Sequence, residues 1–94
     1  MSISVGHSTE ATKENAVAVG YNSKANGESS VAISGATTAA AKSIAIGTEA
    51  QATKEGSIAQ GWKSLASSKG TVAIGGSTDG TELGAQATDL YASA

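Results

Sequence analysis

The sequence predicts an all-β solenoid, in which short coils of two strands each stack along one axis. A motif of Ile or Val, Ala, Ile or Val, and Gly recurs along the 94 residues, with one 13-residue interval among intervals of 14. All eleven Ile and Val residues occupy the first or third place of a unit. Alternation with a period of two is typical of strands, and a fixed repeat length is typical of stacked architectures. The six units begin at Ile3, Val17, Val31, Ile44, Ile58 and Val72.

Each unit predicts a strand over its first three places, followed by a turn, a second short strand and a polar return. Glycine marks the turn in the fourth place, except in the third unit, where it is displaced by one place to Gly35. A return stretch such as TKEG closes the coil. The second strand is expected around the ninth place, which holds Ala11, Ala25, Ala39, Ala52, Ala66 and, in the last unit, Gly80.

The size of the side chains predicts which face each one takes. A coil of 14 residues encloses a thin interior, so the small alanines of the second and ninth places are expected to meet across it. The Ile and Val side chains then point outward by alternation and form a continuous apolar stripe along one side. Because such a stripe is not left in water, it predicts association with further copies in closed cyclic symmetry. The alternative is a monomeric solenoid with Ile and Val inside the coils.

Gln60 is the single polar residue on this stripe, in the third place of the fifth unit. Around a shared axis, copies of its amide would converge, and leaving them unpaired would cost about 1 to 3 kcal/mol per group. We interpret Gln60 as a device that sets the register of the assembly, with its amides bonded to one another, to water or to an ion. The residues predicted to face the axis are Val5, Val17, Val19, Val31, Ile33, Ile44, Ile46, Ile58, Gln60, Val72 and Ile74.

Composition excludes several classes of function. The net charge is −2 and arginine is absent, which disfavours nucleic acid and anionic membranes as partners. No apolar run approaches the roughly 18 residues of a membrane span. His7 is the only histidine, so no other histidine can complete a Ser-His-Asp triad, and no nucleophile elbow is present. No enzyme activity, cofactor or metal is therefore expected, and His7 is interpreted as a solvated turn residue.

Four large side chains are candidates for binding on the outer side of the coils. His7, Tyr21 and Trp62 share the fifth place of their units, and Leu65 follows in the eighth place of the fifth unit. For Trp62, the only tryptophan, two interpretations stand. The indole covers the adjoining turn or a neighbouring chain, or it is an exposed anchor for a ligand on a host surface.

Residues 3 to about 85 resemble the head repeats of trimeric autotransporter adhesins, the YadA-like family, as seen in AVAVGYNSKANGESS, SVAISG and SIAIGTEAQATKEGS. The resemblance implies a left-handed parallel β-roll that forms a homotrimer with its first strands about the threefold axis. It also implies a role in attaching bacteria to host matrix or cells. The same head repeat occurs in bacteriophage fibres.

The sequence lacks the signal peptide, heptad stalk, neck and anchor of an adhesin, which favours a fibre or decoration protein on a virion surface. The alternative is the head of an adhesin on a bacterial cell surface. The expected partners are two further copies, a scaffold protein of the virion or cell surface, and a host-surface ligand. Residues 1–85 are expected to form the roll, and residues 86–94 a tail outside the repeat that caps it or docks a partner.

Overall fold

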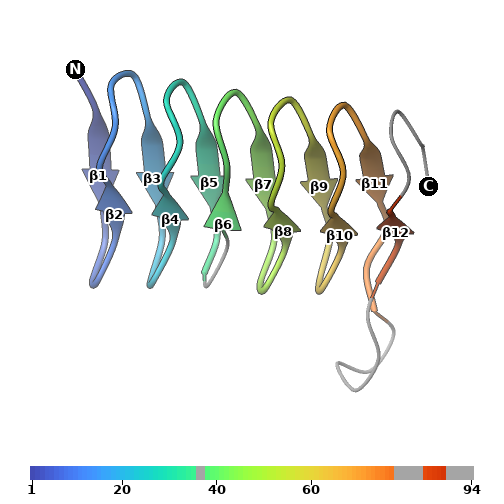
Figure 1. The fold of residues 1–94 in the computed structure, drawn as a ribbon. Coiled ribbons are helices and arrows are strands. Elements are labelled where there is room, and N and C mark those ends of the chain that lie inside the picture. Colours follow the sequence, from blue (N-terminus) through green and yellow to red (C-terminus); the bar gives the residue numbers. More distant parts are fainter. Residues whose placement is uncertain (36–37, 78–83, 89–94) are drawn as a thin grey trace.

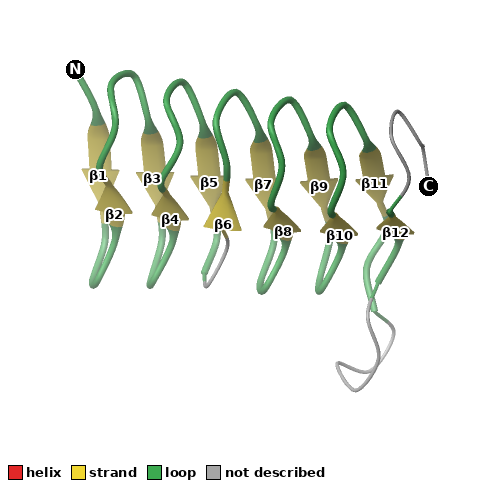
Figure 2. Ribbon diagram, in the orientation of Figure 1, coloured by secondary structure: helices red, strands yellow, loops and turns green. Residues whose placement is uncertain are grey.

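The computed structural model describes residues 1–35, 38–77 and 84–88 as two parallel β-sheets with no helix (Figure 2). Six strands of three residues form the first sheet: β1 (Ile3–Val5), β3 (Val17–Val19), β5 (Val31–Ile33), β7 (Ile44–Ile46), β9 (Ile58–Gln60) and β11 (Val72–Ile74). Six strands of two residues form the second sheet: β2 (Glu10–Ala11), β4 (Lys24–Ala25), β6 (Thr38–Ala39), β8 (Gln51–Ala52), β10 (Leu65–Ala66) and β12 (Gln86–Ala87).

The coils stack along one direction, and each coil contributes one strand to each sheet (Figure 1). Every strand pair is parallel, and equivalent places of successive units lie opposite one another. Val17 pairs with Val31, for example, and Ala25 pairs with Ala39. The predicted all-β solenoid, the six unit starts and, in the first five units, the second strand at the ninth place are confirmed.

The core between the sheets consists of alanine. The second-place alanines of β3 to β11 and the ninth-place alanines of β4 to β10 expose no surface, and the outward Ile and Val side chains are half-buried or exposed. The Cα atoms extend 31 × 27 × 11 Å, a thin molecule that methyl groups suffice to fill. The alternative in which Ile and Val fill the coil interior is therefore wrong.

Buried hydroxyl groups complete the core at both corners of the coil, and the repeat pattern did not reveal them. Ser57 ends the fourth unit, and its hydroxyl donates to the carbonyl of Lys54 at 2.7 Å. At the opposite corner the Ser64 hydroxyl donates to the carbonyl of Gly61 at 3.0 Å. Such bonds let a corner turn inward without leaving a buried polar group unpaired. The fully buried hydroxyl residues are Ser23, Ser30, Ser43, Ser57, Ser64 and Thr71.

Glycine in the fourth place satisfies two conditions at once. Gly61 has a φ of 125°, which side chains rarely adopt, and a Cβ there would lie 2.7 Å from the carbonyl carbon of Gly75 in the next coil. The third unit differs, because Ser34 takes this place with a φ of 77°. The Ser34 amide donates to Val19 just as the Gly20 amide donates to Val5, so the strand is not displaced.

The 13-residue unit is shortened at its return corner and not at the turn where glycine is displaced. Four residues, 34–37, join β5 to β6, and four residues, 61–64, also join β9 to β10. Four residues, 40–43, join β6 to β7, whereas five residues, 53–57, join β8 to β9. The displaced glycine at Gly35 therefore does not account for the missing residue, which is absent from the return corner.

The last coil extends beyond the expected end of the roll at residue 85. Eleven residues, 75–85, separate β11 from β12, and Ala87 of β12 pairs with Ala66 and is buried. Ala87 therefore occupies the inner place for which Gly80 was expected. The boundary between residues 85 and 86 is corrected, because the polar connection is longer in this unit and misleads a count by 14. Gly80 and residues 89–94 of the expected tail lie outside the described residues.

Candidate functional site

The outer face of the first sheet is a continuous apolar surface, which we call the Ile/Val face. Strict parallel register stacks the first and third places into two columns along this face. Val5 and Ile74, in the first and last described strands of this sheet, are 56% and 55% exposed. All the residues predicted to face a shared axis lie on this one face: Val5, Val17, Val19, Val31, Ile33, Ile44, Ile46, Ile58, Gln60, Val72 and Ile74.

Gln60 interrupts the third-place column of the Ile/Val face. It pairs in register with Ile46 on one side and Ile74 on the other, and its side chain is exposed. Its amide makes no hydrogen bond with any described residue of the chain. A polar group with both donors and an acceptor therefore stands free within an otherwise aliphatic surface.

The corner that follows the first strand carries three of the four predicted binding residues in one column. His7, Tyr21 and Trp62 each occupy the fifth place, and the imidazole of His7 stacks on the Tyr21 ring with centroids 5.6 Å apart and planes 6° apart. Tyr21 is 65% exposed and Trp62 is 41% exposed. The stacked pair was not foreseen, because the sequence places His7 and Tyr21 in one column but does not fix their ring orientations.

Leu65 lies apart from this column, on the outer face of the second sheet. It pairs in register with Gln51 and Gln86 and is half-buried. The register neighbours of Leu65 on this outer face are polar, whereas the outer face of the first sheet is apolar. Leu65 therefore does not share a surface column with His7, Tyr21 and Trp62, which we call the aromatic corner.

Two ion pairs link successive coils along polar columns. The Lys24 amine lies 3.8 Å from a Glu10 carboxylate oxygen, and the Lys63 amine lies 3.3 Å from a Glu49 oxygen. All four side chains are partly or largely exposed, so each pair contributes less than about 1 kcal/mol. These pairs keep the polar side of the roll solvated and do not mark a site.

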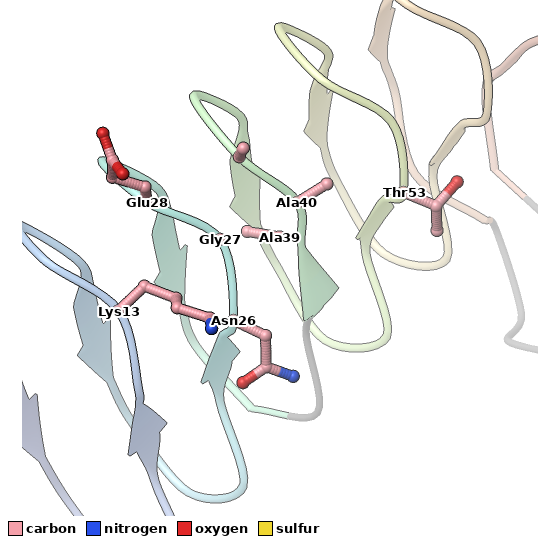
Figure 3. Close-up of a pocket in the computed structure, with 8 residues that line it drawn as sticks. Lys13, Asn26, Gly27, Glu28, Ala39, Ala40 and Thr53 are labelled. Atoms are coloured by element: carbon pink, nitrogen blue, oxygen red, sulfur yellow. The ribbon is translucent and has the colours of Figure 1, made fainter.

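The shortened return corner of the third unit leaves a surface hollow of about 550 Å³, which we call the notch (Figure 3). Alanines of the third coil form its middle, and side chains of the first, second and fourth coils surround it. Its polar groups are one amine, one carboxylate, one amide and one hydroxyl. The lining residues are Lys13, Asn26, Gly27, Glu28, Ala39, Ala40, Ala41 and Thr53.

Tight packing accompanies the notch on the side of the second coil. A Cβ on Gly27 would lie 2.1 Å from the amide nitrogen of Ala41. With one residue fewer in its return corner, the third coil crosses directly over the backbone of the second. Only glycine at position 27 leaves room for that crossing.

Neither a metal site nor a membrane helix is evident in the part of the chain that the structure describes. The described residues contain no group of three or more His, Cys, Asp or Glu side chains placed to hold a metal ion. Within the same ranges, no helix is long and apolar enough to cross a membrane.

Comparison with known proteins identifies the repeat. No curated protein and no solved structure matches the chain. The family described as "YadA head domain repeat (2 copies)" matches residues 2–23, 11–33, 34–50 and 52–78. These matches cover all six strands of the first sheet. The chain belongs to the YadA head domain repeat family.

Proposed function

We propose that the protein is a non-enzymatic homotrimeric module of a surface fibre, with the Ile/Val face of each chain turned toward the threefold axis. The observation that carries the proposal is the division of side chains between the two sides of β3 to β11. Alanine fills the interior, and the larger aliphatic side chains lie outside on one face. Packing three such faces together removes this apolar surface from water and contributes about 25 cal/mol per Å² buried.

Light scattering tests the trimer directly. Three chains of 9.1 kDa give a mass of about 27 kDa in solution. Ile46→Lys places a charge in the middle of the Ile/Val face and is expected to reduce the mass to that of one chain. Thr53→Lys, on the polar side of the roll, is the matched control and leaves the trimer intact. A mass other than three chains for the unaltered protein refutes the proposal.

The module serves attachment or structure on the outside of a particle or cell. Modules of this family belong to surface-exposed adhesins, and the chain has neither the positive charge nor the arginine expected of a nucleic-acid binder. A virion fibre or decoration protein is the preferred setting, held by a scaffold protein of the virion. The alternative is an adhesin head on a bacterial surface, bound to host matrix or cells. Mass spectrometry of purified phage particles and of bacterial outer membranes distinguishes the two settings.

No pocket with a catalytic constellation supports an enzymatic alternative in the described ranges. The notch offers single copies of an amine, a carboxylate, an amide and a hydroxyl, and the only histidine of the chain is exposed at another corner, against Tyr21. The features that remain for recognition are the outer side chains of the coils. Among these, the aromatic corner presents the largest exposed rings.

A further inference from the structure

The aromatic corner contains a gap at the level of the third coil. Successive coils place His7, Tyr21, Gly35, Thr48, Trp62 and Gly76 in the fifth place of their units. Backbone hydrogen bonds hold the same relation along this column, with Glu49 donating to Gly35 and Lys63 donating to Thr48, as Asn22 donates to His7. Gly35 therefore stands directly after Tyr21 in the column and contributes no side chain.

One face of the Tyr21 ring is occupied, and among the described residues no ring stacks on the other. The imidazole of His7, from the preceding coil, covers the first face in a nearly parallel stack. The second face is on the side of Gly35. Among the described residues, a Cβ added to Gly35 would meet the Tyr21 carbonyl at 3.6 Å and the Thr48 hydroxyl at 3.8 Å, which are ordinary contacts. The described residues therefore leave room at this level of the column.

The dimensions of the gap suit one ring. Coils of a parallel β-solenoid lie about 4.8 Å apart, and the His7 and Tyr21 centroids are 5.6 Å apart. A ring that enters above Gly35 thus meets Tyr21 at stacking distance and continues the column. Thr48, with its exposed hydroxyl, stands at the next level, and Trp62 follows one coil further.

The polar surroundings select the chemistry of that ring. Thr48 offers an uncharged hydroxyl beside the gap, and Ser34, the residue before Gly35, is exposed as Thr48 is. Glu49 and Lys63, which follow Thr48 and Trp62 in the chain, are paired with one another. A neutral ring with an apolar face and hydroxyls at its edge fits this environment. The C–H bonds on one face of a pyranose pack against the electron-rich face of tyrosine, while its hydroxyls bond to the serine and threonine.

We propose that Tyr21, Gly35 and Thr48 form a binding site for a pyranose ring of a surface glycan. The inference rests on the proposed surface function and names the ligand class for it. A planar aromatic side chain of a partner protein would stack on the same ring, but it would leave the hydroxyls of the site without partners.

A glycan array followed by saturation-transfer NMR with free methyl pyranosides tests the site on the full chain. Tyr21→Ala is expected to weaken binding by about tenfold or more, and Tyr21→Phe to preserve it, because phenylalanine retains the stacking face. Gly35→Asn is expected to abolish binding by filling the gap. Its φ of 67° is compatible with asparagine, which the chain already holds at Asn15 with φ 60° and Asn22 with φ 61°.

Gln51→Ala, on the outer face of the second sheet, is the control variant and leaves binding unchanged. Absence of binding to any pyranoside refutes the site, as does binding that survives both Tyr21→Ala and Gly35→Asn. Capture of an aromatic peptide in place of a pyranoside also refutes it. Light scattering on each variant separates this inference from the proposed function: an intact trimer without sugar binding rejects only the glycan site, whereas the loss of the trimer in the unaltered protein rejects the proposed function.

Discussion

Ala45 and Ala59 lie opposite one another in the parallel pair of β7 and β9, and neither exposes any surface. Both face an interior that only methyl groups fill, so the separation of the two sheets depends on the size of these side chains. Ala59→Leu is expected to destabilise the fold by about 1 to 3 kcal/mol, since overpacked interiors force the backbone apart. Chemical denaturation measures the change.

Ile58→Leu supplies the control for that substitution, because Ile58 is the outward neighbour of Ala59 on the same strand. It changes shape on the Ile/Val face and leaves the interior untouched, so its effect on stability is expected to be smaller. Equal destabilisation by both variants would contradict an alanine-only interior.

Gln60 provides a test of how the assembly is specified. Gln60→Ile completes the aliphatic column between Ile46 and Ile74 and is expected to raise the melting temperature of the trimer. The physical reason is the removal of amides whose burial costs about 1 to 3 kcal/mol where they remain unpaired. The same substitution is expected to broaden the distribution of masses in light scattering, because the polar layer that fixes register is lost.

Gln51→Ile is the matched control for this prediction. Gln51 is exposed in β8, in register with Leu65 on the outer face of the second sheet. The melting temperature is expected to change little there. A melting temperature that falls on Gln60→Ile contradicts the assignment of a register device.

Gly27 tests the account of the shortened unit. Gly27→Ala places a methyl group 2.1 Å from the Ala41 nitrogen and is expected to cost more than about 3 kcal/mol, because neither backbone segment is free to move aside. Thermal unfolding followed by circular dichroism measures the loss. Gly56→Ala is the comparison: its Cβ meets only the Gly70 nitrogen, at 3.9 Å, and its positive φ costs about 1 to 2 kcal/mol. Similar losses for the two variants would rule out crowding as the reason for glycine at position 27.

The buried corner hydroxyls are expected to be replaceable by alanine at moderate cost. Ser57→Ala removes the bond to the Lys54 carbonyl and is expected to lower the free energy of unfolding by about 0.5 to 1.5 kcal/mol. Ala16 already occupies the equivalent corner of the first coil and is fully buried, which shows that a methyl group fits there. Ser57→Val, which is larger, is expected to cost more. Equal stability of the alanine and valine variants in denaturant would show that the corner is not tightly packed.

Trp62 distinguishes a structural role from a recognition role. Because its side chain is 41% exposed at the corner, Trp62→Ala is expected to leave the trimer intact and to lower stability only modestly. Binding to isolated host surfaces, measured with the trimeric variant, shows whether the indole contributes an anchor. Dissociation of the trimer on this substitution would instead assign the indole to contacts between chains.

The strands and the faces of their side chains could be predicted because alternation with a period of two fixes the face of every residue in a strand once one residue is placed. Once Ala18 and Ala32 are placed inside, Val17 and Val19 must lie outside, and parallel register then gathers the Ile/Val face. This reasoning also placed Gln60 correctly within its column. The prediction depended on two features: the strands have a constant length, and the thin interior of the coil admits only small residues such as alanine.

The parts that the sequence did not reveal lie in the corners. A connection of variable length defeats counting, so the strand that contains Ala87 was assigned to a tail, and the pattern did not locate the shortening of the third unit between Ala39 and Ile44. The stacking of His7 on Tyr21 depends on ring orientations that no period determines. Open space beside Gly35 is likewise a property of neighbouring coils in contact, and a linear pattern does not record it.

Because the register is identical at every step of both sheets, the length of the module is set by the number of coils. Each coil contacts only the coils before and after it, so duplication of an internal unit presents the same surfaces to both neighbours. The length of the module would then change in increments of about 4.8 Å, while its width and the composition of the Ile/Val face stay the same. Selection for a longer or shorter projection from a surface would act on the number of units and leave the chemistry within each unit unaltered.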